Sequence, residues 1–398
     1  MEYQCSQSVT ILNWGIMRLS SLFIFISLIT VSCIEPFMPE TTSYDDVLFI
    51  EARITDDYRM PPLVKISRTA PIGSDQASAD YPVSGADVYI LSSDGSEYPF
   101  YESLSGEYLP VDINFSGEAG KSYKLILYHG GNTYESGFEE LLSSPPIDSI
   151  TAAPGTEKRS ETGDPVQGLQ FYVSTHIDDP PPSYYRWMLD ATFKYKMPFI
   201  ASHIYDGSSP VYFDSRDIIN CWKSYDINNI FISGTEGLTE NAIVKAPLNF
   251  ADQYGDELSL RYSLHVKQLR ISRQAYEFWS DLDKLTNQTG GLYESQPFRL
   301  EGNIRCSSDP LVNVTGIFEV AGVSESRAFF SRPSEFEILT LNCEMVEVGT
   351  ESMPWSRLSS GDYLFFMEGF PSAYYTSRIE CFDCLSRGGT SEKPSFWE

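Results

Sequence analysis

The sequence is poor in basic residues. Its 398 residues contain 28 Lys and Arg against 55 Asp and Glu, which gives a formal net charge of −27. So acidic a chain is a poor ligand for nucleic acid, whose phosphates require Lys and Arg. It is equally unsuited to an electrostatic grip on anionic lipid. We therefore expect a body that stays clear of negatively charged surfaces and does not bind nucleic acid.

The sequence also lacks the short motifs of common catalytic sites. None of its four histidines lies in an H-E-x-x-H pattern, and no G-x-S-x-G elbow or Gly-rich phosphate loop occurs. His176, Asp178 and Asp179 could offer ligands to a divalent cation, but Asp-Asp-Pro-Pro is more typical of a turn. We predict no catalytic residue, no metal site and no cofactor, and we assign no ligand-binding residue.

No apolar run is long enough to span a bilayer comfortably, which takes roughly 20 residues. The stretch Arg18–Cys33 instead has one positive charge, a short apolar run and small residues directly before a cysteine. That order is typical of a lipoprotein signal peptide. We predict that residues 1–32 are removed and that Cys33 is lipidated, since several acyl chains anchor a protein firmly. A buried strand and an uncleaved anchor are the alternatives.

The true start of the chain is predicted at Met17, because Arg18 follows it directly and Glu2 is unusual in a signal peptide. After Cys33, residues 33–44 contain Pro36 and Pro39 and no periodic pattern. We interpret them as a lipidated tether.

Five cysteines remain in the exported part and are candidates for disulfides: Cys221, Cys306, Cys343, Cys381 and Cys384. The odd number leaves one free or bonded elsewhere. The pair Cys381-x-x-Cys384 has neither a second pair for zinc nor a thioredoxin-like context for redox chemistry. Because short loops are hard to close, each of these two is expected to pair with a distant partner such as Cys221 or Cys343.

Strand patterns dominate the chain, and aromatic residues make up 14% of it. In residues 45–145, apolar and polar side chains alternate in several short runs, the first at Leu48–Ile54. The turn residues Ser93–Ser96 separate two of these runs. We predict an N-terminal β-sandwich of Ig-like or transthyretin-like type here. Pro145 and Pro146 mark its end.

Residues 146–398 are predicted to form a larger, strand-rich second β domain with a Cys-containing tail. Residues 151–168 are polar and are expected to form a loop. The clearest strand pattern is Leu258–Val266, with further strands at Gly316–Val320 and Arg327–Ser331. One amphipathic helix is expected after Ser272, with Ala275, Phe278, Trp279, Leu282 and Leu285 on its apolar face and Gly290-Gly291 at its end. The fold class is therefore mostly β.

The order of several segments resembles the Bacteroidetes lipoproteins known as domain of unknown function 4249. The segments are Leu48–Ala52, Ile66–Pro71, Val83–Val88, Gly120–Leu125, Pro145–Ile150, Asp179–Pro181 before Tyr184–Trp187, Gly302–Ile304, and Cys381–Cys384 through Gly388-Gly389 to Pro394–Trp397. The resemblance implies an outer-membrane lipoprotein encoded beside TonB-dependent receptors. It implies no chemistry. In such bacteria, acids after the lipidated cysteine favour surface display, and Glu35 fits that pattern.

We therefore expect a non-enzymatic, surface-exposed outer-membrane lipoprotein that assists a TonB-dependent nutrient importer, by capturing ligand or by packing against the receptor. Two alternatives remain open. One is a surface hydrolase of glycans or peptides that uses carboxylates, and the other is an adhesin or structural surface protein. Tyr184, Tyr185, Trp187, Trp222, Trp279 and Trp355 are the aromatic residues that could stack on a glycan or peptide ligand, although core packing is the default for most.

Overall fold

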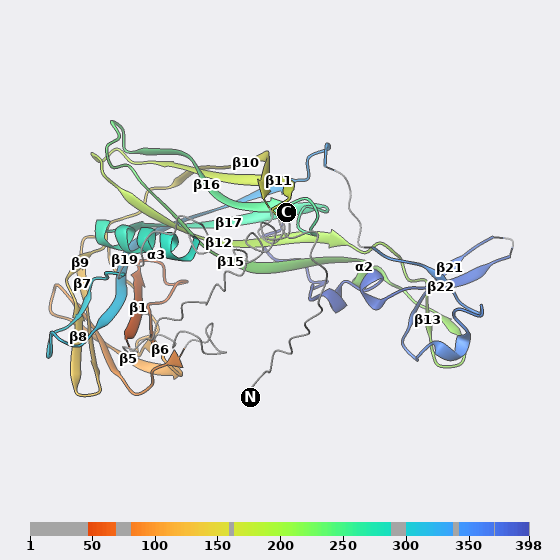
Figure 1. Ribbon diagram of the computed structural model, residues 1–398, viewed down its shortest axis with the longest axis horizontal. Helices are drawn as coiled ribbons and strands as arrows, with labels where there is room; N and C mark the ends of the chain where they lie inside the picture. Colours follow the sequence, from red (N-terminus) through yellow and green to blue (C-terminus); the bar gives the residue numbers. More distant parts are fainter. Residues whose placement is uncertain are drawn as a thin grey trace, which may run out of the picture. The chain divides into compact units, whose positions relative to one another are not determined.

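The computed structural model describes residues 47–68, 81–158, 163–287, 300–336, 342–369 and 371–397. These residues belong to one compact unit, Asp46–Glu398. The predicted signal peptide, Cys33 and the tether lie outside the described residues. The prediction of a mostly β fold is confirmed, because strands account for most of the regular structure (Figure 1).

The N-terminal strands form part of a long mixed sheet. Its alternating side chains bury one face, as at Leu48, Ile50, Ala52 and Ile54, so the period-2 pattern is confirmed there. The strands of this part are β1 (Leu48–Thr55), β2 (Leu63–Arg68), β3 (Tyr81–Pro82), β4 (Asp87–Ser92), β5 (Glu97–Leu104), β6 (Glu107–Pro110), β7 (Ser122–His129), β8 (Asn132–Ser136) and β9 (Glu139–Glu140). They run in the order β1-β2-β6-β5-β4-β7-β8, with β3 beside β2 and β9 beside β7.

A second group of strands packs as two layers. One layer continues the long sheet as β15-β12-β17-β19, and the other is the sheet β10-β11-β16. Phe171 of the smaller sheet stacks on Tyr262 of the larger, with ring centroids 5.0 Å apart, and a shared core fills the space between the layers. The strands are β10 (Ile147–Lys158), β11 (Pro165–His176), β12 (Tyr184–Lys196), β15 (Asn220–Gly234), β16 (Ala242–Asp252), β17 (Arg261–Ile271) and β19 (Val314–Ser331). A further strand, β18 (Ile304–Cys306), pairs with β8 at the other end of the long sheet.

Strand β19 joins the two groups. Its first half pairs in parallel with β1, from Val314 to Ala321. Its second half pairs antiparallel with β17, from Gly322 to Ser331. The two strands predicted in this region are therefore one continuous strand. The domain boundary predicted near residue 145 stays a prediction, although strand pairing carries the sheet across both parts.

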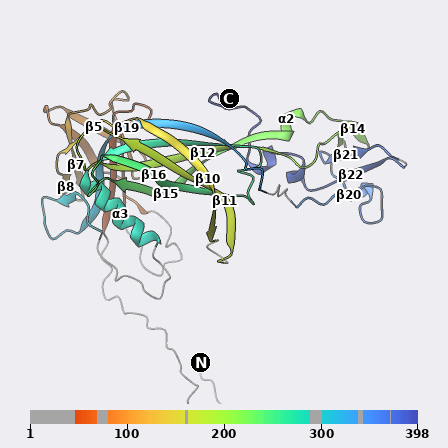
Figure 2. The same ribbon diagram turned by 90° about the horizontal axis from the view of Figure 1, so that it is seen from above.

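The predicted amphipathic helix is confirmed as α3 (Arg273–Asn287). Ser272 Oγ accepts a hydrogen bond from the backbone N–H of Ala275 at 3.2 Å, which satisfies one of the free donors of the first turn. Ala275, Phe278 and Trp279 are buried against the sheet, and the helix contacts β12, β15 and β19 (Figure 2). The predicted end at Gly290-Gly291 lies outside the described residues.

A buried ion pair fixes α3 to the sheet. The carboxylate of Glu319, only 2% exposed, accepts hydrogen bonds from Arg186 Nη1 at 3.1 Å and from Trp279 Nε1 at 2.7 Å. The Arg186 guanidinium also lies 3.7 Å from the centroid of the Trp279 ring, a cation–π geometry. A buried charge is tolerated because it is paired and hydrogen-bonded in this way.

A smaller sheet is built from two distant segments. It has the order β14-β13-β21-β22-β20. Its strands are β13 (His203–Tyr205), β14 (Pro210–Tyr212), β20 (Val346–Glu347), β21 (Tyr363–Met367) and β22 (Ala373–Thr376). The same segments also contain the short helix α2 (Arg216–Ile219) and the 3₁₀ turns η1 (Trp355–Arg357), η2 (Ile379–Cys381) and η3 (Leu385–Arg387). Disulfides Cys221–Cys384 and Cys343–Cys381 fasten the C-terminal segment. The expected use of cysteines in disulfides, with distant partners for Cys381 and Cys384, is confirmed.

The loop predicted at 151–168 is wrong. Residues 147–158 form β10, and β11 starts at Pro165. Most β10 side chains are exposed or half-buried, so no apolar alternation marks the strand. Backbone pairing with β11 along its length stabilises it instead. The strand predicted at Leu258–Val266 starts later, at Arg261, because Asp256–Ser259 form a turn closed by the Ser259 N–H and the Asp256 carbonyl.

In the segment Gly302–Ile304, Gly302 and Asn303 allow the chain to lie close to β19. A Cβ on Gly302 would lie 1.6 Å from the Gly316 carbonyl oxygen, so only glycine fits there. The next residue, Asn303, receives a hydrogen bond from the Phe318 N–H at 2.7 Å and donates one to the Phe318 carbonyl at 2.8 Å. Its side chain thus bonds to β19 as a neighbouring strand would.

We expect Gly302→Ala to lower the free energy of unfolding by about 2 kcal/mol, because the added methyl group must displace backbone rather than a flexible side chain. Gly137→Ala is the matched control, since a Cβ there meets no atom within 4 Å, and its effect should stay within about 0.5 kcal/mol. Urea denaturation of both variants measures the difference. Equal stabilities would contradict the close approach.

Candidate functional site

An open polar groove in the second group of strands runs along the edge strand β15. It has a volume of about 660 Å³ and lies between β15 and β16. Seven consecutive residues of β15, Tyr225–Phe231, line it, and Leu248, Asn249 and Phe250 of β16 lie across from them. Because the groove follows an edge rather than a face, strand backbone as well as side chains borders it.

A β-bulge interrupts β15 within this groove. Leu189 of β12 pairs with Ile227, whereas Trp187 pairs with Phe231, so three residues of β15 oppose one residue of β12. The extra residues include the exposed Asn228 and Asn229. Bulges occur often beside functional sites, because they redirect side chains and end regular pairing.

A second, smaller cavity of about 270 Å³ shares Asp226, Ile227, Asn228 and Asn229 with the groove. It differs in containing two bases, Arg186 and Lys267, and in being lined by β12 and β17 as well. The bulge therefore separates a mixed-charge cavity from a groove whose charged residues are all acidic.

Tyr225, which lines the groove, is hydrogen-bonded to the buried Tyr262. Tyr225 Oη lies 3.2 Å from Tyr262 Oη, and the Asn249 amide donates to Tyr262 Oη at 3.1 Å. Burial raises the pKa of Glu257 above its ordinary value, an effect that a hydrogen bond from Tyr225 partly offsets. Burial likewise raises the pKa of both tyrosines, so they stay neutral donors.

A chain of charges crosses the opposite face of the same sheet. His265 Nδ1 lies 2.7 Å from Asp190 Oδ2, and His265 Nε2 lies 3.3 Å from Glu325 Oε2. Arg327 pairs with Asp190 at 3.1 Å and Arg59 with Glu325 at 2.6 Å. Burial opposes ionisation of Asp190, but His265 and Arg327 outweigh it and hold the pKa of Asp190 below its ordinary value.

This arrangement does not position His265 as a general base. Both ring nitrogens face carboxylates, so neither is directed at a nucleophile. The nearby hydroxyl of Ser263 accepts a hydrogen bond from Arg327 at 3.0 Å. The roles of a Ser-His-Asp triad are therefore not met by these residues.

The other residues singled out from the sequence lie apart from the groove. His176 contacts Asp148 at 2.8 Å, and this hydrogen bond raises the pKa of the imidazole. Asp179 pairs with Arg270 at 3.2 Å. Among the described residues, no group of three or more His, Cys, Asp or Glu is arranged to hold a metal ion.

Most of the candidate aromatic residues belong to the core. Trp187 is buried and donates its indole N–H to Gln268 Oε1 at 3.0 Å. Tyr184, Tyr185 and Trp279 are also buried. Trp355 is 36% exposed and lies beside Tyr205 and Tyr374 of the small sheet.

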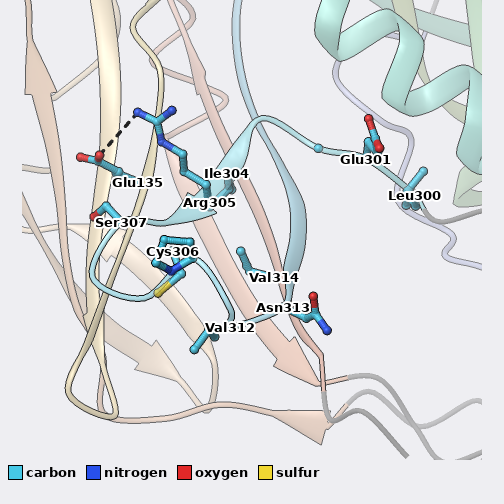
Figure 3. Close-up of a pocket in the computed structure, with 12 residues that line it drawn as sticks. Glu135, Leu300, Glu301, Ile304, Arg305, Cys306, Ser307, Val312, Asn313 and Val314 are labelled. Carbon is cyan, nitrogen blue, oxygen red and sulfur yellow. Dashed lines mark ion pairs between the residues drawn. The ribbon is translucent and has the colours of Figure 1, made fainter.

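Among the cysteines that the structure describes, Cys306 is the one without a disulfide, and it is buried at a cavity of about 590 Å³. Figure 3 shows the Arg305–Glu135 pair on one side of this cavity and the Glu301 side chain on the other. The side chain of Cys306 belongs to the core of the N-terminal strands, so core packing accounts for it.

Residues 34–327 match the family described as Domain of unknown function (DUF4249), and the chain belongs to that family. The segments Cys381–Trp397, which carry part of the resemblance, lie beyond the matched residues. No curated protein matches the chain. One solved structure that resembles it is a DUF4785 family protein from Legionella pneumophila, 12% identical, covering 56% of this chain and 52% of that one with a TM-score of 0.15. The chain thus spans about half the length of that protein.

No helix in the described part of the chain is long and apolar enough to cross a membrane.

The groove itself was not found from the sequence. Its strands β15 and β16 have irregular burial patterns, and the bulge depends on the register with β12. The dipeptide Asn228-Asn229 inside an otherwise apolar run is the one local signal that could have indicated it.

Opposite pH responses are expected for two carboxyl groups. The pKa of Glu257 is raised, so its contribution to stability is full below about pH 4.5 and is lost as the pH rises through its folded-state pKa. As the pH rises from 4 to 8, we therefore expect the free energy of unfolding of Glu257→Gln to increase relative to that of the wild type, because glutamine does not ionise. Urea denaturation across this range is the measurement.

Asp190→Asn provides the contrast. The pKa of Asp190 is lowered, so its contribution is present above about pH 3.8 and is lost as the pH falls through its folded-state value. As the pH rises, the free energy of unfolding of this variant should decrease relative to that of the wild type. The same sign for both variants would contradict the two environments described here.

Proposed function

We propose that this chain is a surface-exposed outer-membrane lipoprotein, anchored through Cys33, that binds ligand without catalysing a reaction and assists a TonB-dependent nutrient importer. The observation that carries the ligand-binding part is the open groove along β15, with its acidic and amide side chains beside a bulge. Binding sites of this kind combine a concave surface with a few polar groups.

The lipid anchor is supported by the sequence of Arg18–Cys33. The partnership is supported by the TonB-dependent receptors beside which the resemblance implies that such lipoproteins are encoded. The acidity of the chain suits a body held away from an anionic cell surface. Both ring nitrogens of His265 face carboxylates, so the polar cluster around His265 is not arranged for acid–base chemistry. This supports a binding role over a catalytic one.

One observation favours a surface hydrolase as a second candidate. Glu257 has a raised pKa and borders the groove together with the exposed Asp226. Glycoside hydrolysis uses two carboxyl groups, one of which is an acid with a raised pKa.

The importer role predicts a stable complex. Affinity capture of the tagged protein from intact outer membranes, read by mass spectrometry, should recover one TonB-dependent receptor in near-equal amount. Cys33→Ser should release the protein from the membrane fraction, because the lipid attachment point is lost. Capture without any receptor would contradict the importer role, and retention of Cys33→Ser in the membrane would contradict the anchor.

The hydrolase candidate predicts turnover on a panel of glycans and peptides. If Glu257 is the acid, Glu257→Gln should lower the rate by about a hundredfold or more while thermal unfolding still shows a folded chain. Glu97→Gln, an exposed residue on β5, is the control and should retain the wild-type rate. Absence of turnover across the panel would remove this candidate.

A further inference from the structure

The outward edge of β15 offers unpaired backbone groups. Near its start, Trp222 exchanges both backbone hydrogen bonds with Thr390, at 2.9 and 2.8 Å, on the side away from β12. Backbone groups of an antiparallel strand alternate between its two sides. Because pairing with β12 is regular from Asn220 to Ile227, the N–H and C=O groups of Ser224 and Asp226 also point outward. Neither has a backbone hydrogen-bond partner among the described residues.

The groove keeps this edge open between two walls. Leu248–Phe250 of β16 and Glu157 of β10 border it on the side of the smaller sheet, and Asp283 of α3 borders it as well. Ser224 lies directly before the lining residues Tyr225–Phe231, and Asp226 is one of them. Up to the bulge, the outward backbone groups of β15 recur at every second residue, about 6.6 Å apart at about 3.3 Å per residue. An extended chain has the same repeat.

The charge of the groove selects the occupant further. Its charged lining residues are all acidic: Glu157, Asp226, Glu257 and Asp283. No Lys, Arg or His is found among the described residues that line the groove. Within the described residues, Glu157 and Asp226 form no ion pair, and both are exposed. The aromatic rings of Phe231 and Phe250 lie in the same lining, where the aliphatic stem of a lysine or arginine would be covered.

We propose that the groove binds an extended peptide carrying Lys or Arg, which adds as a strand to the outward edge of β15. Backbone hydrogen bonds at Ser224 and Asp226 supply affinity, as in other cases of strand addition. The carboxylates on the walls select basic side chains. This inference deepens the ligand-binding part of the proposed function and does not depend on the importer.

A simpler role for the same features is protection against aggregation. Bulges and charges on an edge strand discourage pairing with a second copy of the chain. If protection were the only role, the edge would need no groove, and a basic peptide would bind only by charge attraction. Peptides of equal charge that differ in their ability to form backbone hydrogen bonds distinguish the two roles.

The test uses fluorescence anisotropy of the purified chain with three labelled peptides of about eight residues, long enough for the groove. The first alternates Lys and Thr. The second alternates Glu and Thr. The third keeps every Lys but replaces each Thr by Pro, which removes backbone donors and hinders pairing. We expect the first peptide to bind at least about tenfold more tightly than either of the others.

Variants of the chain test the same contacts from the protein side. Asp226→Asn and Glu157→Gln should each weaken binding of the Lys-Thr peptide by about threefold to tenfold, whereas Glu97→Gln, an exposed acid on β5, should leave it unchanged. Ser224→Pro removes one outward N–H, and it also removes the 2.7 Å hydrogen bond between the Ser224 and Thr192 hydroxyls. Ser224→Ala loses only that hydroxyl bond and is the control, so Ser224→Pro should bind the peptide more weakly than Ser224→Ala. Circular dichroism and thermal unfolding check that each variant is folded.

Equal binding of the Lys-Thr and Lys-Pro peptides would overturn strand addition, since it would show attraction by charge alone. Failure of the Lys-Thr peptide to bind would overturn the proposal entirely. Receptor capture is measured separately, so loss of the importer role and loss of this peptide site are distinguishable results.

Discussion

The architecture depends on one strand, β19, because its two halves pair with strands from different parts of the chain. Its register with β1 brings the chain's first strand beside residues more than 260 positions later, and its register with β17 extends the same sheet into the two-layered region. Gly316 permits the close approach of β19 to β1, since a Cβ there would lie 1.9 Å from the Ile50 carbonyl oxygen. Gly302 and Asn303 then pack on the half of β19 that β17 leaves uncovered. Such long-range pairing carries a large loop-closure cost before it is rewarded.

The buried Glu319 makes this strand pairing specific. It lies on β19, and its two donors come from β12 and α3. Removing either donor would leave a buried carboxylate without full compensation, which costs several kcal/mol. The ion pair thus favours one placement of α3 over others that bury the same apolar face. That placement also puts Asp283 at the groove, so the position of the helix connects the core to the candidate site.

Local patterns sufficed for elements whose burial repeats regularly. Leu48–Ile54 alternates because one face is buried, and α3 was predicted from Ser272 and its apolar face. Local patterns did not predict β10, because this strand is largely exposed and is stabilised by backbone pairing with β11. The disulfide partners could be narrowed but not assigned, because pairing depends on the distance between segments in space. The groove was missed for a similar reason: the bulge at Asn228 exists only relative to β12.

An exposed edge strand is normally a liability, because a second copy of the same chain can pair with it. Here the chain carries a net charge of −27, and the groove beside β15 adds carboxylates on both walls. Two identical acidic edges repel each other, whereas a basic strand is attracted, so the same charges that prevent self-association would select the proposed ligand. Specificity of this kind needs no deep apolar pocket. It needs an open backbone edge, walls that admit one extended chain, and charge of one sign, and residues Ser224–Phe231 with their neighbours combine all three.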